Sequence, residues 1–93
     1  MATQLRRYEV TEGGMDRVVE VWKSIAAVRR QYGFTVEFAY VDRKRNEFVW
    51  AVSHPDWEKA SAIYDHSPER AAIFADGPPP IDRATITMVE PVE

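Results

Sequence analysis

Tyr64 and His66 are the best acid–base candidates in this sequence. A positioned tyrosine and histidine can donate and accept a proton near neutral pH. They lie where a helical segment is predicted to break, a place where side chains could turn toward a cavity. Residues two apart point to different sides of an unbroken helix. An exposed helix end beside Asp65 is therefore the competing interpretation.

Glu37 is a third candidate, a carboxylate inside a predicted strand. Strand alternation places it beside Ala39, Val49 and Ala51 on a face of small residues. If that face lines a cavity, desolvation would raise the pKa of Glu37 and suit it to proton transfer. Two other interpretations stay open: an ion pair with Arg29, on the apolar side of the long predicted helix, or a position facing solvent.

Four further residues are candidates for ligand binding. Trp22, Tyr40 and Trp50 could stack on a flat molecule, and Arg29 could hold an acidic or enolic oxygen. Aromatic residues at such spacings more often pack in a core or an interface. Because pockets are few per protein, we expect about one of these aromatic residues to contact a ligand.

Other kinds of chemistry lack their usual signatures. The chain has no cysteine, and its only histidines, His54 and His66, are separated by a predicted helix. That spacing does not fit a zinc or two-histidine iron site, so we expect no metal and no axial ligation of haem. A glycine-rich phosphate loop and a nucleophile elbow are also absent. We therefore expect no tightly bound cofactor, and proton transfer is the chemistry that the residues could support.

Hydrophobic periodicity and turn residues divide the chain into alternating strands and helices. A long helix with an apolar stripe is the most secure element, and Gly33 marks its end. The predicted strands cover residues 5–10, 34–41, 47–53 and 83–89, and the predicted helices cover 15 to about 32, 57 to about 65, and 68 to about 74.

The second and third strands are predicted to form a hairpin around residues 42–46. If this five-residue loop closes symmetrically, Tyr40 faces Phe48, Phe38 faces Trp50, and Val36 faces Val52. All three pairs would then share one side of the sheet and make a large aromatic face. The pattern alone does not decide which face meets the helices.

Composition indicates one folded domain spanning residues 1–93, with 45% hydrophobic and 29% charged residues. The net charge of −3 argues against a nucleic-acid partner, because phosphate neutralisation needs a basic excess. The basic run 43–45 is interpreted as a solvated turn. The sequence shows neither a signal-peptide pattern nor a run long enough to span a membrane, so a cytoplasmic location is expected.

The predicted order, βαββαβ, is typical of a ferredoxin-like α+β fold with a four-stranded antiparallel sheet. Both helices of such a fold pack on one face of the sheet. An uncovered aromatic face would be a large apolar patch, which usually marks an interface. A second copy of the chain could cover it by isologous pairing, so we expect a homodimer.

Several segments resemble the small bacterial NIPSNAP-like proteins, in the expected order along nearly the whole chain. They are residues 5–10 (LRRYEV), 13–16 (GGMD), 46–50 (NEFVW), 64–70 (YDHSPER) and 89–91 (VEP). The resemblance implies the dimeric α/β barrel superfamily, in which two ferredoxin-like protomers join their sheets.

That superfamily includes cofactor-independent monooxygenases, polyketide cyclases, lactone isomerases and haem-degrading enzymes, so the fold does not give the function. Its cyclases use a tyrosine and a nearby histidine in a Y-x-x-H-P neighbourhood. This sequence departs from that pattern, because one residue separates Tyr64 from His66 and Ser67 precedes Pro68.

Two hypotheses follow. The first is a small cofactor-independent acid–base enzyme of the cyclase, isomerase or monooxygenase type, acting on an apolar or aromatic metabolite. The second is a non-catalytic module that dimerises and presents a ligand-binding pocket.

Overall fold

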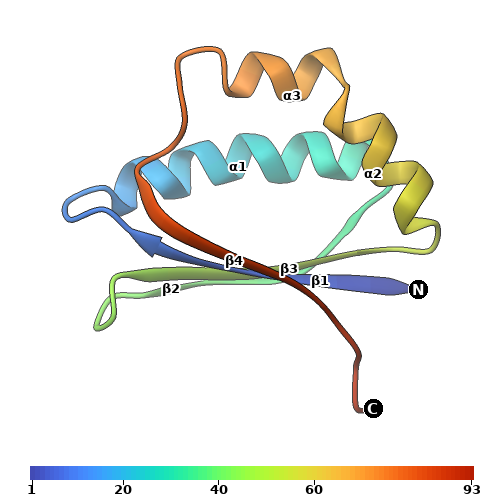
Figure 1. Ribbon diagram of the computed structural model, residues 1–93, viewed down its shortest axis with the longest axis horizontal. Helices are drawn as coiled ribbons and strands as arrows, with labels where there is room; N and C mark the ends of the chain where they lie inside the picture. Colours follow the sequence, from blue (N-terminus) through green and yellow to red (C-terminus); the bar gives the residue numbers. More distant parts are fainter.

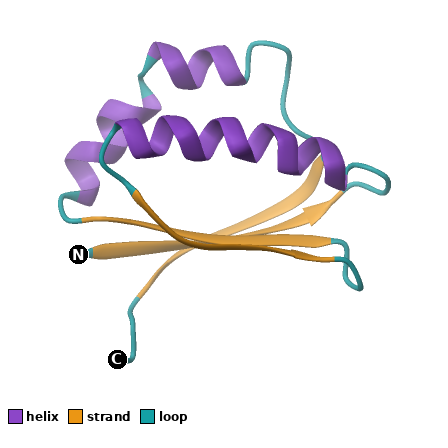
Figure 2. Ribbon diagram, turned by 180° about the vertical axis from the view of Figure 1, so that it is seen from behind, coloured by secondary structure: helices purple, strands orange, loops and turns teal.

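The computed structural model describes all residues, 1–93, and confirms the βαββαβ order, with two short helices in the second crossover. The four strands form one antiparallel sheet in the order β2-β3-β1-β4. All three helices lie on one side of this sheet (Figures 1 and 2). The elements are β1 (Ala2–Val10), α1 (Met15–Gln31), β2 (Thr35–Asp42), β3 (Glu47–His54), α2 (Trp57–Asp65), α3 (Pro68–Ile73) and β4 (Ile81–Val89).

Helix α1 covers the sheet because its apolar residues recur at helical spacing. Met15, Val18 and Ile25 are buried along the stripe that meets the strands. The helix ends where Gly33 adopts a φ of +86°, a conformation that costs glycine little and other residues more. The chain then turns directly into β2, as the sequence predicts.

The core lies between the helices and one face of the sheet. Tyr8 from β1 and Phe48, Trp50 and Val52 from β3 point toward the helices and are almost completely buried. The sequence did not decide which face of the sheet meets the helices. The structure shows that it is the face bearing the aromatic residues of β3. None of the helices is long and apolar enough to cross a membrane.

The predicted hairpin register is wrong by one residue near the loop. Ala39 faces Trp50 and Val41 faces Phe48, so Phe38 and Tyr40 point to the opposite side of the sheet. The single large aromatic face therefore does not form. The pairing of Val36 with Val52 is confirmed, because an irregularity between Val36 and Phe38 restores the predicted register.

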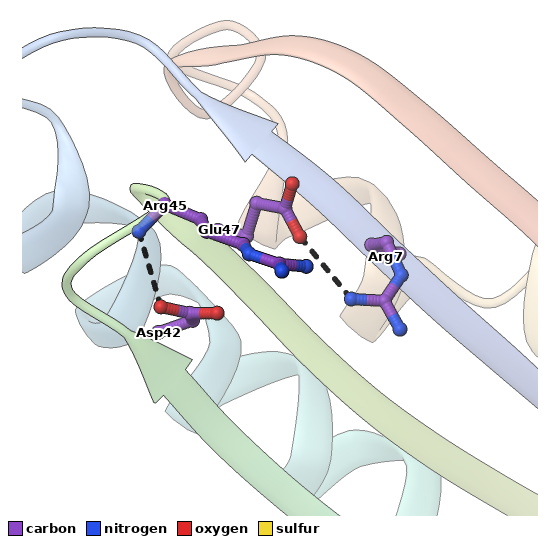
Figure 3. Close-up of polar contacts among 4 residues, drawn as sticks. All are labelled: Arg7, Asp42, Arg45 and Glu47. Atoms are coloured by element: carbon purple, nitrogen blue, oxygen red, sulfur yellow. Dashed lines mark hydrogen bonds and ion pairs between the residues drawn. The ribbon is translucent and has the colours of Figure 1, made fainter.

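The loop itself explains the error. Asp42 pairs with Glu47, which leaves four residues in the turn instead of five. Asn46 takes a φ of 54° in this turn, and the Asp42 carboxylate accepts a hydrogen bond of 3.1 Å from the backbone N–H of Arg45 (Figure 3). The shorter loop shifts β2 by one residue, and the bulge at position 37 takes up the difference.

The other face of the sheet carries no helix, and we call it the outer face. Alternation places Leu5 and Arg7 of β1 on it, and Arg7 forms an ion pair of 3.1 Å with Glu47 (Figure 3). Phe38 and Tyr40 of β2 lie on the same face, with 37% and 65% of their surface exposed. Exposed aromatic rings on an uncovered sheet make this face a candidate interface.

Candidate functional site

A pocket of about 270 Å³ opens between α1, the β1 and β4 side of the sheet, and the connector that leads into β4. We call it the α1–β4 pocket. Its walls are mainly apolar, and they include Val18 and Ile25 from α1, Phe74 after α3, Pro79 of the connector, and Ile86 of β4. Consecutive prolines cannot continue a helix. The chain therefore runs past the pocket without regular structure before β4 begins.

The polar groups at this pocket come from alternate residues of β1. Arg6 and Tyr8 both point to the helix side, because residues two apart in a strand share a face. The Tyr8 hydroxyl oxygen accepts hydrogen bonds from Arg6 Nη1 and from Trp50 Nε1, each 3.1 Å long. Arg6 Nε also donates to the side-chain oxygen of Gln4 at 2.8 Å. Both bonds use the hydroxyl oxygen as the acceptor, which leaves its hydrogen available as a donor.

Trp22 contributes a second free donor. Its ring packs edge-on against Trp50 and tilted against Phe48, with centroid distances of 5.9 and 5.6 Å. Its indole N–H is buried and has no hydrogen-bond partner. Since buried donors are nearly always paired, an unpaired one at a pocket wall is a site where a ligand oxygen would gain a hydrogen bond.

The pocket therefore combines an apolar wall with three donors: a guanidinium, a phenol hydroxyl and an indole N–H. A small number of polar groups in a mainly apolar cavity is typical of small-molecule sites. Donors of this kind stabilise an oxygen that carries full or partial negative charge. No carboxylate or histidine lines the pocket.

Solved structures with the same fold span the whole chain. An uncharacterized NIPSNAP domain protein from Burkholderia xenovorans has a TM-score of 0.84 at 14% identity, covering 99% of this chain and 95% of that one. The chain has the fold of the dimeric α/β barrel superfamily.

Two further solved structures have the same fold as this chain. A NIPSNAP family protein from Agrobacterium tumefaciens has a TM-score of 0.81 at 15% identity, covering 98% of this chain and 87% of that one. An antibiotic biosynthesis monooxygenase has a TM-score of 0.77 at 16% identity, covering 100% of both chains. No family model and no curated protein sequence matches the chain significantly.

Within this dimeric α/β barrel fold, the four predicted binding residues lie in different places. Trp22 lines the α1–β4 pocket. Trp50 is fully buried and does not line the pocket, but it contacts the lining residues Tyr8, Trp22 and Arg6. Tyr40 is exposed on the outer face, because of the shifted register.

Arg29, the fourth predicted binding residue, is buried in a cage of aromatic rings. Its guanidinium carbon lies 4.0 Å from the ring centre of Tyr64, 4.7 Å from that of Phe34 and 5.9 Å from that of Trp57. Only 3% of its surface is exposed, and neither Nε nor Nη1 has a partner. Burial lowers the pKa of Arg29 below its ordinary value.

The predicted catalytic residues are not brought together. Tyr64 is buried against Arg29, whereas His66 is exposed at the end of α2, with Nδ1 2.9 Å from the carbonyl oxygen of Ala62. Glu37 is exposed on the outer face and accepts a hydrogen bond of 2.6 Å from the Ser53 hydroxyl. None of the three lines the α1–β4 pocket. Their catalytic roles stay predictions.

The expected surroundings of Glu37 are wrong in one respect. Ala39 lies on the helix side, opposite Trp50, so it does not share a face with Glu37 as the uniform alternation predicted. The bulge at Glu37 is the reason. An ion pair between Glu37 and Arg29 does not form either, since Arg29 is enclosed by aromatic rings on the other side of the sheet.

Sequence reasoning missed Arg6 and Tyr8 as site residues. The signal was present, because a basic and a phenolic side chain two residues apart in a strand must share a face. Each face of this strand, β1, carries both polar and apolar residues, however. Its pattern therefore did not show which face meets the helices. No group of three or more His, Cys, Asp or Glu side chains is arranged to hold a metal ion.

Proposed function

We propose that this protein binds a small apolar or aromatic molecule in the α1–β4 pocket, with an oxygen atom of the ligand facing Trp22 and Tyr8. The observation that carries the proposal is the pair of free donors at an apolar wall: the buried indole N–H of Trp22 and the hydroxyl hydrogen of Tyr8. A ligand that merely filled the space would leave the Trp22 donor unpaired. A ligand that accepts from it gains a hydrogen bond in a dry environment.

The size and lining of the pocket favour a compact ligand. Its volume of about 270 Å³ is close to the lower end of small-molecule sites, about 300 Å³. Such a space suits a molecule of one or two rings. The faces of Trp22 and Phe74 offer flat apolar surface to such a ring system.

Binding is tested by closing the pocket with matched tryptophan substitutions. Ala84 lines the pocket, whereas the next residue of β4, Thr85, points to the outer face. Titration of the protein's fluorescence with 2-naphthol should show saturable binding that Ala84→Trp abolishes and Thr85→Trp preserves. Calorimetric titration of the three proteins checks the result without tryptophan as the reporter. Equal binding by both variants would place the ligand elsewhere and refute the proposal.

A second candidate function is catalysis without a bound cofactor, of the cyclase, isomerase or monooxygenase type. Two observations favour it: the donors would stabilise negative charge on an enol or phenol oxygen, and the fold is shared with an antibiotic biosynthesis monooxygenase. Tyr8 would be the proton donor at the pocket. Glu37 or His66 was predicted as the base and Tyr64 as a donor, but none of them lines this pocket, so a base there would come from the substrate. A positioned acid or base contributes about 10²–10⁴-fold to a rate.

Catalysis is tested by turnover of the ligands that bind. Tyr8→Phe should lower kcat, and at least one of Glu37→Gln, Tyr64→Phe and His66→Ala should lower it too if the predicted residues take part. Ligands that bind tightly but are recovered unchanged would make the protein a non-catalytic binding module.

We also propose that the chain forms a homodimer through the outer face of its sheet. The exposed rings of Phe38 and Tyr40 support this, since stable interfaces bury about 1,600 Å² and are enriched in aromatic residues. Sedimentation at micromolar concentration should show a dimer that Tyr40→Asp dissociates. Ile63→Asp, at an exposed apolar residue of α2, is the control and should leave the dimer intact. A wild-type monomer would refute the proposal.

A further inference from the structure

Arg6 and Arg29, which lie between the sheet and the helices, have no acidic ion-pair partner. The ion pairs of the molecule use Arg7, Arg17, Arg43 and Arg83, all of them largely exposed. Arg6 is half-buried and Arg29 is almost completely buried, yet neither forms an ion pair. This distribution is unusual, because buried charges are normally paired.

The two unpaired cations belong to the same region of the interior. Arg6 lies at the α1–β4 pocket, where it is the one charged residue of the lining. Arg29 lies one helical turn beyond Ile25, another lining residue, on the same side of α1. The two charges are close enough for Arg6 to lower the pKa of Arg29 further. Arg6 therefore brings a positive charge without an acidic partner to the pocket, whereas Arg29 lies outside the pocket lining and its charge is partly balanced by Asp65.

Neighbouring side chains compensate this charge only in part. The Arg6 guanidinium carbon is 5.8 Å from the ring centre of Trp50, and three rings surround Arg29. Cation–π contacts stabilise a guanidinium but leave its net charge in place. Two of the donor nitrogens of Arg29 remain unpaired. An anion in the pocket would supply the negative partner that Arg6, the one charged residue of the lining, lacks.

Building on the proposed binding function, we infer that the ligand of the α1–β4 pocket is a planar aromatic acid, whose carboxylate, phenolate or enolate oxygen faces Arg6, Tyr8 and Trp22. Apolar walls accept the ring, and the guanidinium of Arg6 offers a cation to the charged oxygen, with the donors of Tyr8 and Trp22 in the same lining. Charge-assisted hydrogen bonds are about twice as strong as neutral ones, so the pocket should select an anion over a neutral molecule of the same shape.

Matched probes test the inference on the wild-type protein. Titration calorimetry would compare 2-naphthoate with 2-naphthamide, which has the same rings and no charge. We expect 2-naphthoate to bind about 10- to 100-fold more tightly. A nitronaphthol that is ionised at neutral pH distinguishes a phenolate from a carboxylate as the charged group. If it binds more tightly than 2-naphthoate, the ligand is a phenolate or an enolate. If 2-naphthoate binds more tightly, the ligand is a carboxylate.

Variants of neighbouring residues on one strand provide the matched control. Arg6→Gln should lower the affinity for 2-naphthoate much more than that for 2-naphthamide, so that the preference is lost, and Arg6→Lys should retain part of the preference. Arg7→Gln changes the next residue, which points to the outer face, and should change neither affinity. Circular dichroism checks that each variant is folded.

The outcomes separate this inference from the proposed binding function. Equal affinity of the wild-type protein for 2-naphthoate and 2-naphthamide would overturn the anionic ligand and leave the pocket proposal standing. An unchanged preference in folded Arg6→Gln would also overturn it. Failure of every probe, charged or neutral, would overturn the binding function and the inference together.

Discussion

Replacing Tyr8 with phenylalanine removes one oxygen atom and little else. The phenyl ring can keep its stacked position beside Phe48, where the ring centres are 6.2 Å apart and the planes differ by 13°. The lost oxygen is the acceptor for Trp50 Nε1 and Arg6 Nη1. The substitution therefore tests the polar cluster beneath the pocket without making a large cavity.

The magnitude depends on what happens to each donor. Trp50 has no exposed surface, so its indole N–H would stay buried without a partner, at a cost of about 1–3 kcal/mol. Arg6 is half-buried, so water can replace the acceptor that its guanidinium loses. The Arg6 donor therefore contributes less than Trp50 to the loss of stability. We expect Tyr8→Phe to lower the free energy of unfolding by about 1–3 kcal/mol, most of it through Trp50.

Urea unfolding would measure the change, with an unchanged m-value indicating that the variant unfolds in the same two-state manner. Tyr40→Phe is the control, because the Tyr40 ring is 65% exposed and should change stability by less than about 0.5 kcal/mol. When Trp50 is also replaced by phenylalanine, Tyr8→Phe should lower the free energy of unfolding by clearly less than it does in the wild-type protein. Equal effects of Tyr8→Phe and Tyr40→Phe would refute the reasoning, since they would show that the Trp50 donor needs no acceptor.

Three other sites give predictions of stability. The pKa of Tyr32 is raised above 10.0, mainly because its hydroxyl donates to the Glu69 carboxylate, so this contact should stabilise the fold fully below pH 10 and be lost as the pH rises through the higher folded-state pKa. Tyr32→Phe should remove that alkaline loss; an unchanged pH profile of the melting temperature would contradict it. Asn46→Ala should destabilise the protein by about 1–2 kcal/mol more than Asn46→Gly, because of the φ of 54°, and equal unfolding midpoints would refute this. Ser67→Ala should cost about 0.5–2 kcal/mol, because the hydroxyl caps α3 by accepting from the Arg70 N–H at 3.2 Å; a change below 0.3 kcal/mol by denaturant unfolding would exclude that role.

The order of the elements could be predicted because local signals agree with the tertiary structure, although β1 begins at Ala2, three residues earlier than predicted. The apolar stripe of α1 is buried where the periodicity places it, and the positive φ of Gly33 ends the helix as expected. Strand β4 begins two residues earlier than predicted, at Ile81, which pairs with Val10 across an irregularity. Periodicity identifies such an element more reliably than its first residue.

The hairpin register could not be predicted from alternation alone. The sequence shows where a turn lies, but the number of loop residues depends on whether Asn46 adopts a positive φ. A change of one residue in the loop moves Phe38 and Tyr40 from the core to the outer face. The bulge at Glu37 then restores the predicted pairing of Val36 with Val52. Nothing in the composition of the strand predicts this bulge.

The candidate site was predicted only in part, for the same reason. Trp22 was predicted because a helix stripe identifies its buried face directly. Arg29 on the same helix is buried as well, but it does not line the pocket. Arg6 and Tyr8 lie on a strand that is polar and apolar on both sides, so their shared direction becomes visible only when the helices are placed. The unpaired state of the Trp22 donor depends on the positions of all its neighbours and has no signature in the sequence.

The alternation of β1 divides the two proposed functions between the two faces of the sheet. Arg6 and Tyr8 point to the pocket, whereas Arg7, between them, pairs with Glu47 on the outer face. Substitutions of adjacent residues should therefore separate ligand binding from dimer formation. If a change on the outer face also altered ligand affinity, the sheet itself would have to transmit it. The most direct route would be through Trp50, which joins the central strand to the Tyr8 hydroxyl.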